Sequence, residues 1–198
     1  MLMWNEKFAG DAYFYGVAPC EWLVMNRHRY PTGGRALAIG DGEGRNGVYL
    51  ASLGLDTTSL DQSEVGLAKA EKLAAARAVE LSTWHADLAD IELATDHYDV
   101  IVAIYAHLPQ PLRAHTHAAC ARALKPGGLF VLEAFHPKQL NYRSGGPKIV
   151  DLLYRAEDVC SELHGLTVLD AQEGLTQLAE GTGHRGPGYV TRVVARRD

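Results

Sequence analysis

A glycine-rich turn directly after a short apolar stretch is the feature that most restricts how this chain can fold. The pattern runs from residues 35–39 through glycines at positions 40, 42 and 44 to a helical pattern ending near Leu53 and a second stretch at 56–61. Strand, turn, helix and strand in this order let backbone N–H groups approach a charged ligand, while a carboxylate on the second strand accepts from a ribose. The stretch predicts a site for a nucleotide-like cofactor.

The glycines can be aligned with two patterns. A G-x-G-x-G pattern begins at Gly40, where the strand should end, whereas the dinucleotide fingerprint fits only if it begins at Gly42 and ends at Gly47. In a dinucleotide site the first glycine closes the strand, and here that glycine is Gly40, which has no glycine partner at position 45. We favour G-x-G-x-G, with Gly44 as its last member; a tight turn that binds nothing is the alternative.

The alternation of strand and helix patterns predicts an α/β fold with a doubly wound, Rossmann-like sheet. Strands are expected at 35–39, 56–60, 80–84, 98–104, 128–135, 165–172 and 188–196, and helices at about 44–53, 64–79, 110–124 and 155–163. Such alternation requires parallel strands joined by right-handed crossovers. The last two strands have no helix between them, so we expect a seven-stranded sheet whose last strand is antiparallel.

The length of 198 residues and the hydrophobic content of 47% fit a single domain over residues 1–198. We divide it into an aromatic N-terminal cap (1–34), a cofactor-binding core (35–135) and a last part (136–198) with a lid loop and a terminal β-hairpin. The polar, turn-rich segment 136–148 is the expected lid over the carboxyl edge of the sheet, where such folds bind ligands.

Composition excludes several classes of partner. A net charge of −5 argues against nucleic acid, whose phosphates require clustered lysine and arginine. No apolar run approaches the ~20 residues that span a bilayer. Cys20, Cys120 and Cys160 lie far apart and lack the spacing of a metal site. We therefore expect a cytoplasmic protein with a small-molecule substrate, no membrane or nucleic-acid partner and no metal; the oligomeric state stays open.

Two further acids follow predicted strands. Asp61 ends the second strand and is placed to accept from ribose hydroxyls, although it is also a candidate N-cap for the helix that begins at 64. Asp87 is a candidate acceptor for an adenine amino group, with Leu88 donating its backbone amide to the ring; an acid after a strand is common, so this signal is weaker.

Several motifs together resemble the class I S-adenosylmethionine-dependent methyltransferases over nearly the whole chain. They are the run from Ala36 to Leu53, Asp61-Gln-Ser, Asp87-Leu88, Tyr98-Asp-Val-Ile, Leu124-Lys-Pro-Gly-Gly-Leu-Phe-Val and the terminal hairpin. Within that superfamily the chain is most similar to small bacterial proteins related to the tellurite-resistance and thiopurine methyltransferases. The pieces shared with that group are Tyr15-Gly-Val-Ala-Pro19, Gly42-Glu-Gly-Arg-Asn46, Tyr105-Ala-His-Leu-Pro109 with Arg113, Gly145-Gly-Pro-Lys148 and Gly183-His-Arg-Gly186.

The resemblance implies S-adenosylmethionine as the cofactor and assigns residues to it by position. The implied cofactor-binding residues are Gly40, Asp41, Gly42, Gly44, Asn46, Asp61, Gln62, Asp87, Leu88, Ala103 and Tyr105. The family carries an acid two positions before the first glycine, where it helps to hold the cofactor's ammonium group, but this chain has Ala38. Asp41 is the candidate to compensate in part. Loss of one charge-assisted hydrogen bond costs about 1.5–3 kcal/mol.

Three residues are candidates for a catalytic role. His107 follows the fourth strand and is best placed to act as a general base, with packing or capping as the alternative. His184 and Arg185 form a pair that suits an oxyanion or carboxylate acceptor, unless Arg185 pairs with a surface acid. The cap aromatics Trp4, Phe8, Tyr13 and Tyr15 either cover the sulfonium with a π face or pack on the core.

The sequence favours an S-adenosylmethionine-dependent methyltransferase acting by in-line displacement on a small acceptor. The resemblance suggests a thiol or a chalcogen oxyanion, but the acceptor stays unidentified because loops define its pocket. One alternative is a non-catalytic domain that binds or senses the cofactor, which Ala38 makes credible. The other is a nicotinamide-dependent oxidoreductase, which would need a catalytic Tyr and Lys or their equivalent and leaves the Lys-Pro-Gly-Gly turn unexplained.

Overall fold

The computed structural model describes residues 2–198, whose strands form one seven-stranded sheet in the order β3-β2-β1-β4-β5-β7-β6. The strands are β1 (Arg35–Ile39), β2 (Asp56–Asp61), β3 (Ser82–His85), β4 (Tyr98–Ile104), β5 (Leu124–Phe135), β6 (Leu166–Glu180) and β7 (His184–Arg197). β1 to β5 pair in parallel, and β7 runs antiparallel to both of its neighbours. The predicted doubly wound sheet with its last strand antiparallel is confirmed.

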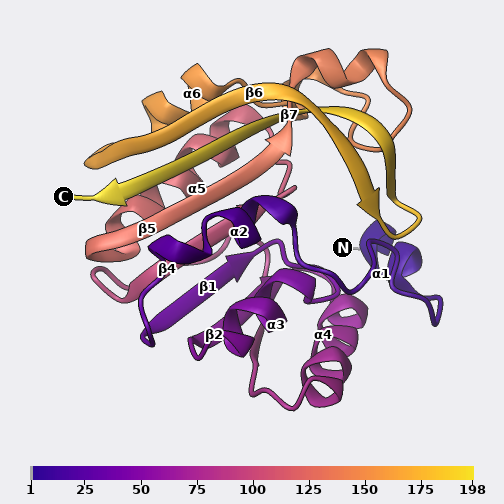
Figure 1. Ribbon diagram of the computed structural model, residues 1–198, viewed down its shortest axis with the longest axis horizontal. Coiled ribbons are helices and arrows are strands. Elements are labelled where there is room, and N and C mark those ends of the chain that lie inside the picture. The colour runs from indigo at the N-terminus through magenta and orange to yellow at the C-terminus, as the bar shows by residue number, and fades with distance from the viewer. Residues whose placement is uncertain (1) are drawn as a thin grey trace.

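Helices cover both faces of this sheet (Figure 1). They are α1 (Leu2–Phe8), α2 (Glu21–Met25), α3 (Arg45–Ser52), α4 (Glu64–Ala76), α5 (Gln110–Ala123) and α6 (Ala156–Glu162), with 3-10 turns η1 (Arg27–Arg29), η2 (Pro137–Asn141) and η3 (Val150–Leu152). Among the described residues, no helix combines the length and the apolar character needed to cross a bilayer.

Burial on both faces explains why the central strands carry continuous apolar runs, such as residues 36–39 of β1. Along β1, Leu37 and Ile39 belong to a core cluster that also contains residues of α5 and α6. Ala36 and Ala38 point the other way, into a cluster with Trp22 of α2 and residues of α3. Because successive side chains of a strand face opposite sides, both sets of apolar residues are needed.

The terminal hairpin is longer than the sequence predicts. β6 extends to Glu180 and β7 begins at His184, so only Gly181–Gly183 turn, and the predicted start of the last strand at 188 is four residues too late. Gly186, Pro187 and Gly188 suggested a loop, but here β7 pairs only with β6, since its pairing with β5 begins at Val190. A strand with one free edge tolerates a proline, which lacks an N–H.

The turn of the hairpin reaches across to the N-terminal segment. In Figure 1 the far ends of β6 and β7 extend beyond the sheet to the neighbourhood of α1. The backbone N–H groups of Thr182 and Gly183 both donate to the carbonyl of Phe14, over 2.9 and 3.0 Å. The N-terminal segment and the turn of the terminal hairpin therefore meet at the carboxyl edge of the sheet.

Gly44 fixes the position of the glycine turn against α4. It precedes α3 with a φ of 86°. A Cβ added there would lie 2.3 Å from the Cβ of Ala70 on α4, far inside van der Waals contact. The close approach of turn and helix therefore requires glycine at this position, both for backbone conformation and for space.

We predict that Gly44→Ala lowers the free energy of unfolding by about 2–5 kcal/mol, combining a left-handed backbone penalty with overpacking. Gly54→Ala is the matched control, because Gly54 has a φ of 90° but open space around it. It should lose only the backbone part, about 1–2 kcal/mol. Urea denaturation measures both, and adding Ala70→Gly should partly restore the first variant. Equal losses at positions 44 and 54 would contradict the steric account.

Candidate cofactor and acceptor site

A cavity of about 460 Å³ lies at the carboxyl ends of the central strands. Gly40 follows β1, Asp61 ends β2 and Tyr105 follows β4, and all three line it. Residues of α1, segments 14–16 and 145–147, and the start of β7 complete its walls. The loops after β1 and β4 leave the sheet where the strand order reverses, which is where open α/β sheets bind ligands.

The glycine turn brings main chain to the cavity wall. Gly40 has a φ of 61°, and a Cβ there would lie 2.9 Å from the Cβ of Ala106. A side chain at position 40 would therefore overlap Ala106, which lines the same cavity, so only glycine lets the turn form a close-fitting cradle here. This cradle fits the predicted role of the turn, which is to let main chain approach the methionine part of S-adenosylmethionine.

Asp61 presents its carboxylate to the same cavity. Its oxygens accept the N–H groups of Gly42 and Ser63, both over 2.8 Å. Burial raises the pKa of Asp61, and each oxygen keeps a lone pair that can accept from a ribose hydroxyl. The N-cap of α4 is Ser63, whose Oγ accepts the N–H of Gly66. The capping role that competed for Asp61 is therefore filled by another residue.

The structure brings most of the predicted cofactor residues together. Those that line the cavity are Gly40, Asp41, Gly42, Asn46, Asp61, Gln62, Asp87, Leu88 and Tyr105. Gly44 and Ala103 lie outside its wall. Gly44 packs on α4, and Ala103 is buried within β4 between Ile39 and Leu132 of the flanking strands. Strand periodicity points Ala103 into the core cluster, so these two residues shape the site without touching it.

Ala38 offers no charge to a cofactor. It is 1% exposed and packs in the apolar cluster below α2 and α3. The nearest acid in sequence, Asp41, is buried beside the turn, where its Oδ2 accepts from Gly47 N–H (3.0 Å) and Ser59 Oγ (2.5 Å). Its Oδ1 has no hydrogen-bond partner among the described residues. Burial raises the pKa of Asp41 to about 7, so the carboxyl ionises close to neutrality.

An ion pair fixes the N-terminal wall of the cavity. The carboxylate of Glu43 lies 2.5 Å from Lys69 Nζ and accepts the N–H of Phe14 over 2.7 Å. Of the predicted aromatic cap, Trp4, Phe8 and Tyr15 line the cavity. Tyr13 does not line it; its hydroxyl donates to the carbonyl of Lys69 over 3.0 Å. The cap is thus partly a wall of the site and partly an anchor.

His184 lies among aromatic rings, one of which is Tyr15 of the N-terminal wall. Its Nδ1 lies 2.7 Å from a carboxylate oxygen of Glu180, and because a carboxylate only accepts, Nδ1 carries the proton and Nε2 keeps a lone pair. The imidazole lies 4.5 Å from the ring of Tyr15, 4.4 Å from Tyr105 and 5.0 Å from Phe135, measured between ring centroids. Burial lowers the pKa of His184, which keeps the ring neutral near pH 7.

The two other catalytic candidates are placed differently. His107 lines the cavity, but its Nδ1 donates to the carbonyl of Leu152 over 2.6 Å and its Nε2 lies 3.5 Å from the N–H of Phe135. Burial lowers the pKa of His107 to about 4. Arg185 is exposed and outside the cavity wall, and its backbone N–H donates to Ser144. Because neighbouring strand residues face opposite sides, His184 and Arg185 cannot both face one ligand.

Sequence reasoning missed the residues that support His184. Glu180 stands directly opposite His184 across the hairpin, and Arg45 of α3 donates to Glu180 over 2.8 Å. Because the sequence predicts that the last strand begins at 188, it does not indicate this cross-strand pair; only a tight turn places residues 180 and 184 side by side. Arg45 follows the glycine turn in the sequence, but nothing there indicates its partner at position 180.

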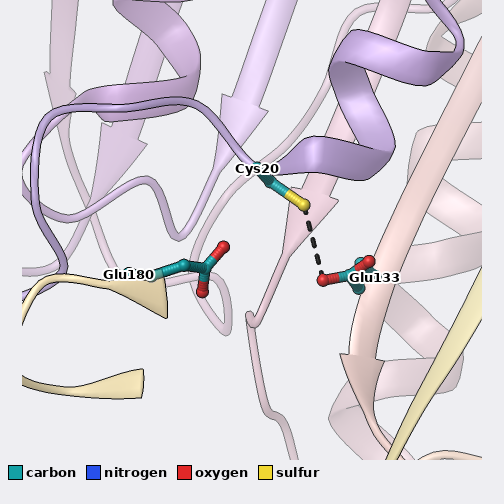
Figure 2. A group of neighbouring side chains, drawn as sticks. All are labelled: Cys20, Glu133 and Glu180. Atoms are coloured by element: carbon teal, nitrogen blue, oxygen red, sulfur yellow. Dashed lines mark hydrogen bonds between the residues drawn. The ribbon is translucent and has the colours of Figure 1, made fainter. Parts of the chain in front are cut away.

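A second cluster of polar groups lies next to the cavity (Figure 2). The ligand atoms of Cys20, Glu133 and Glu180 all lie within 4.8 Å of one another, and the Cys20 thiol donates to Glu133 over 3.4 Å. Arg192 bonds to Glu133 over 2.5 Å, and Arg45 pairs with Glu180. Each carboxylate thus pairs with a guanidinium group, so the negative charges of the cluster are balanced without a bound metal ion.

Residues 36–128 match the model of a family described as a methyltransferase domain. No curated protein sequence matches the chain. Among solved structures, one that concerns the conversion of a disulfide bond into a thioacetal group during echinomycin biosynthesis is 18% identical, with a TM-score of 0.77 over 100% of this chain and 89% of that one. TehB from Haemophilus influenzae is 20% identical, with a TM-score of 0.71 over 90% of this chain and 62% of TehB.

A third structure, an S-adenosylmethionine-dependent methyltransferase from Mesorhizobium loti, is 21% identical, with a TM-score of 0.68 over 90% of this chain and 98% of that one. These likenesses establish the fold, and the family match establishes the class of activity, which sets aside the nicotinamide-dependent alternative. Residues 36–128 of the chain therefore form a methyltransferase domain, set in a sheet with the fold of the class I S-adenosylmethionine-dependent methyltransferases.

Proposed function

We propose that this methyltransferase acts on a small acceptor whose nucleophile is a thiol or a chalcogen oxyanion, with His184 taking the proton from it. One observation carries the proposal. His184 lines the cavity with its Nδ1–H held by Glu180, which leaves Nε2 as an acceptor beside an aromatic wall. A neutral imidazole with one nitrogen anchored is the arrangement that general-base catalysis uses.

The cofactor occupies the half of the cavity around the glycine turn in this proposal. Asp61 accepts from the ribose, Gln62 flanks the adenine, and Asp87 with the backbone of Leu88 holds the adenine edge. All four residues line the cavity. When bound, S-adenosylmethionine supplies an electrophilic methyl group on a sulfonium centre.

His184 then accepts one proton, and its partners Glu180 and Arg45 stabilise the charge that results. A protonated acceptor gives its proton to Nε2, and the imidazolium that forms is stabilised by the Glu180 carboxylate. Arg45 and the bond from His184 hold the pKa of Glu180 low despite its burial, so that the carboxylate stays ionised. The rings of Tyr15 and Tyr105 contact His184 and exclude water, which favours alignment of nucleophile and methyl group.

The choice of acceptor rests on similarity and on the walls of the cavity. The structure that concerns conversion of a disulfide bond into a thioacetal group and TehB are both among the similar folds. The shared motifs support a place beside the tellurite-resistance and thiopurine group. Gly145, Gly146 and Pro147 line the cavity, which supports segment 136–148 as a lid. Three free cysteine thiols suit a reducing cytoplasm.

The role of Asp61 can be tested by binding. We predict that Asp61→Asn weakens S-adenosylhomocysteine binding by about ten- to hundredfold, because it loses charge-assisted hydrogen bonds worth about 1.5–3 kcal/mol. Isothermal titration calorimetry measures this. Asp90→Asn is the control, since Asp90 is exposed and outside the cavity wall, and it should bind as the wild type does. Unchanged affinity in Asp61→Asn would remove Asp61 from the cofactor site.

We propose that Asp41 supplies the carboxylate that Ala38 lacks, and that its ionisation governs affinity. The pKa of Asp41 is about 7, and an ammonium group binds the ionised carboxylate better than the neutral one. Affinity for S-adenosylmethionine should therefore rise as the pH increases from 6 to 8. Asp41→Asn should bind about tenfold more weakly at pH 8 and lose this pH dependence, whereas Asp61→Asn should keep it. Calorimetric titrations at pH 6 and pH 8 measure both effects. A pH dependence that persists in Asp41→Asn would contradict the proposed role of Asp41.

The role of His184 can be tested by turnover. Incubation with labelled S-adenosylmethionine and a panel of small thiols, selenite and tellurite should reveal methyl transfer. His184→Ala should reduce it by about 10²- to 10⁴-fold, the usual contribution of a general base, with unchanged affinity for S-adenosylhomocysteine. His164→Ala is the control, because His164 is exposed and outside the cavity wall. Full transfer by His184→Ala would refute the assignment.

A further inference from the structure

Lys7, at the end of α1, is a cation on the cavity wall without an acidic partner. Its Nζ lies 4.6 Å from the ring centroid of Trp4, 4.9 Å from that of Phe14 and 5.6 Å from that of Tyr15. No carboxylate in the described part of the chain lies within 4.0 Å of this Nζ. The aromatic faces stabilise the ammonium group but leave its charge uncompensated.

The other charged groups of the cavity divide into two sets. Glu43 is paired with Lys69 and Arg45 with Glu180, so neither acts as a free charge. The remaining acids, Asp41, Asp61 and Asp87, lie at or just beyond the carboxyl ends of β1, β2 and β3, where the cationic cofactor is proposed to lie. Lys7 is thus the one positively charged residue of the described cavity wall that has no carboxylate partner.

Lys7 belongs to the side of the cavity that holds His184. Tyr15 connects the two, because its ring lies 5.6 Å from Lys7 Nζ and 4.5 Å from the His184 ring, centroid to centroid. The charge of Lys7 is among the influences that lower the pKa of His184, after burial. A molecule that reaches His184 along the Tyr15 ring therefore comes close to the ammonium group.

We infer that the acceptor is a flat, anionic molecule, such as an aromatic carboxylate, whose charge pairs with Lys7 while its nucleophile faces His184. The walls between these two residues are aromatic, with Phe14, Tyr15 and Tyr105 available to contact a planar ring. The inference deepens the proposed function and rests on it, since it takes the half of the cavity beside His184 as the acceptor pocket. Lys7 then selects for negative charge.

Binding to the complex with S-adenosylhomocysteine tests this without turnover. Benzoate and benzamide are nearly equal in shape and differ in charge. The ratio of their dissociation constants, measured by calorimetry, therefore isolates the effect of the Lys7 charge. The wild type should bind benzoate about tenfold more tightly than benzamide. Lys7→Met should remove the preference, and Lys7→Arg should restore it. Lys72→Met is the control, because Lys72 is exposed on α4 and outside the cavity wall.

Three results would overturn the inference. The first is that the wild type binds the two probes equally or binds neither. The second is that Lys7→Met keeps the preference for benzoate. The third is that Lys7→Met weakens S-adenosylhomocysteine itself as much as it weakens benzoate, which would assign Lys7 to the carboxylate of the cofactor. Failure of the proposed base is a separate result, since it appears as methyl transfer by His184→Ala.

Discussion

The buried ion pair between Glu43 and Lys69 holds together the parts of the molecule that make a site. Glu43 lies in the glycine turn, Lys69 lies on α4, and their charged groups are 2.5 Å apart. Lys69 also donates to the carbonyls of Gly10 and Ala12, both over 2.8 Å, while Glu43 accepts from Phe14. Removing one partner of such a pair costs about 3–5 kcal/mol because a buried charge remains. The same loss would release the N-terminal wall.

Much of the fold follows from the sequence because its determinants are local. β1 and β4 have the predicted bounds, since burial on both faces gives each strand a continuous apolar run, 36–39 and 100–104. The sequence predicts a shorter hairpin than the structure has, because Gly186 and Pro187 favour a loop locally. Pairing with β6 overrides that preference, and no local signal reports a partner that lies in another strand.

The residues of the site also divide into those that the sequence indicates and those that only the structure reveals. Gly40 and Asp61, which line the cavity, could be found because they lie at the ends of strands that are recognisable in sequence. Glu180 and Lys7 could not be found in this way. Glu180 acts through a cross-strand pair, and Lys7 reaches the cavity from α1 through packing against aromatic rings. Their roles arise from tertiary contacts between segments far apart in the chain.

The contact between Phe14 and the hairpin turn also determines when the enzyme is complete during synthesis. The core strands β1 to β5 end at Phe135 and can pair before the hairpin leaves the ribosome, since chains emerge from their N-terminus. The cavity wall that contains Tyr15 and His184 cannot close until Thr182 and Gly183 reach Phe14. A nascent chain can therefore form the cavity wall around Gly40 and Asp61 first and adds His184 last, so that the proposed base is in place only after nearly all of the described chain has been made.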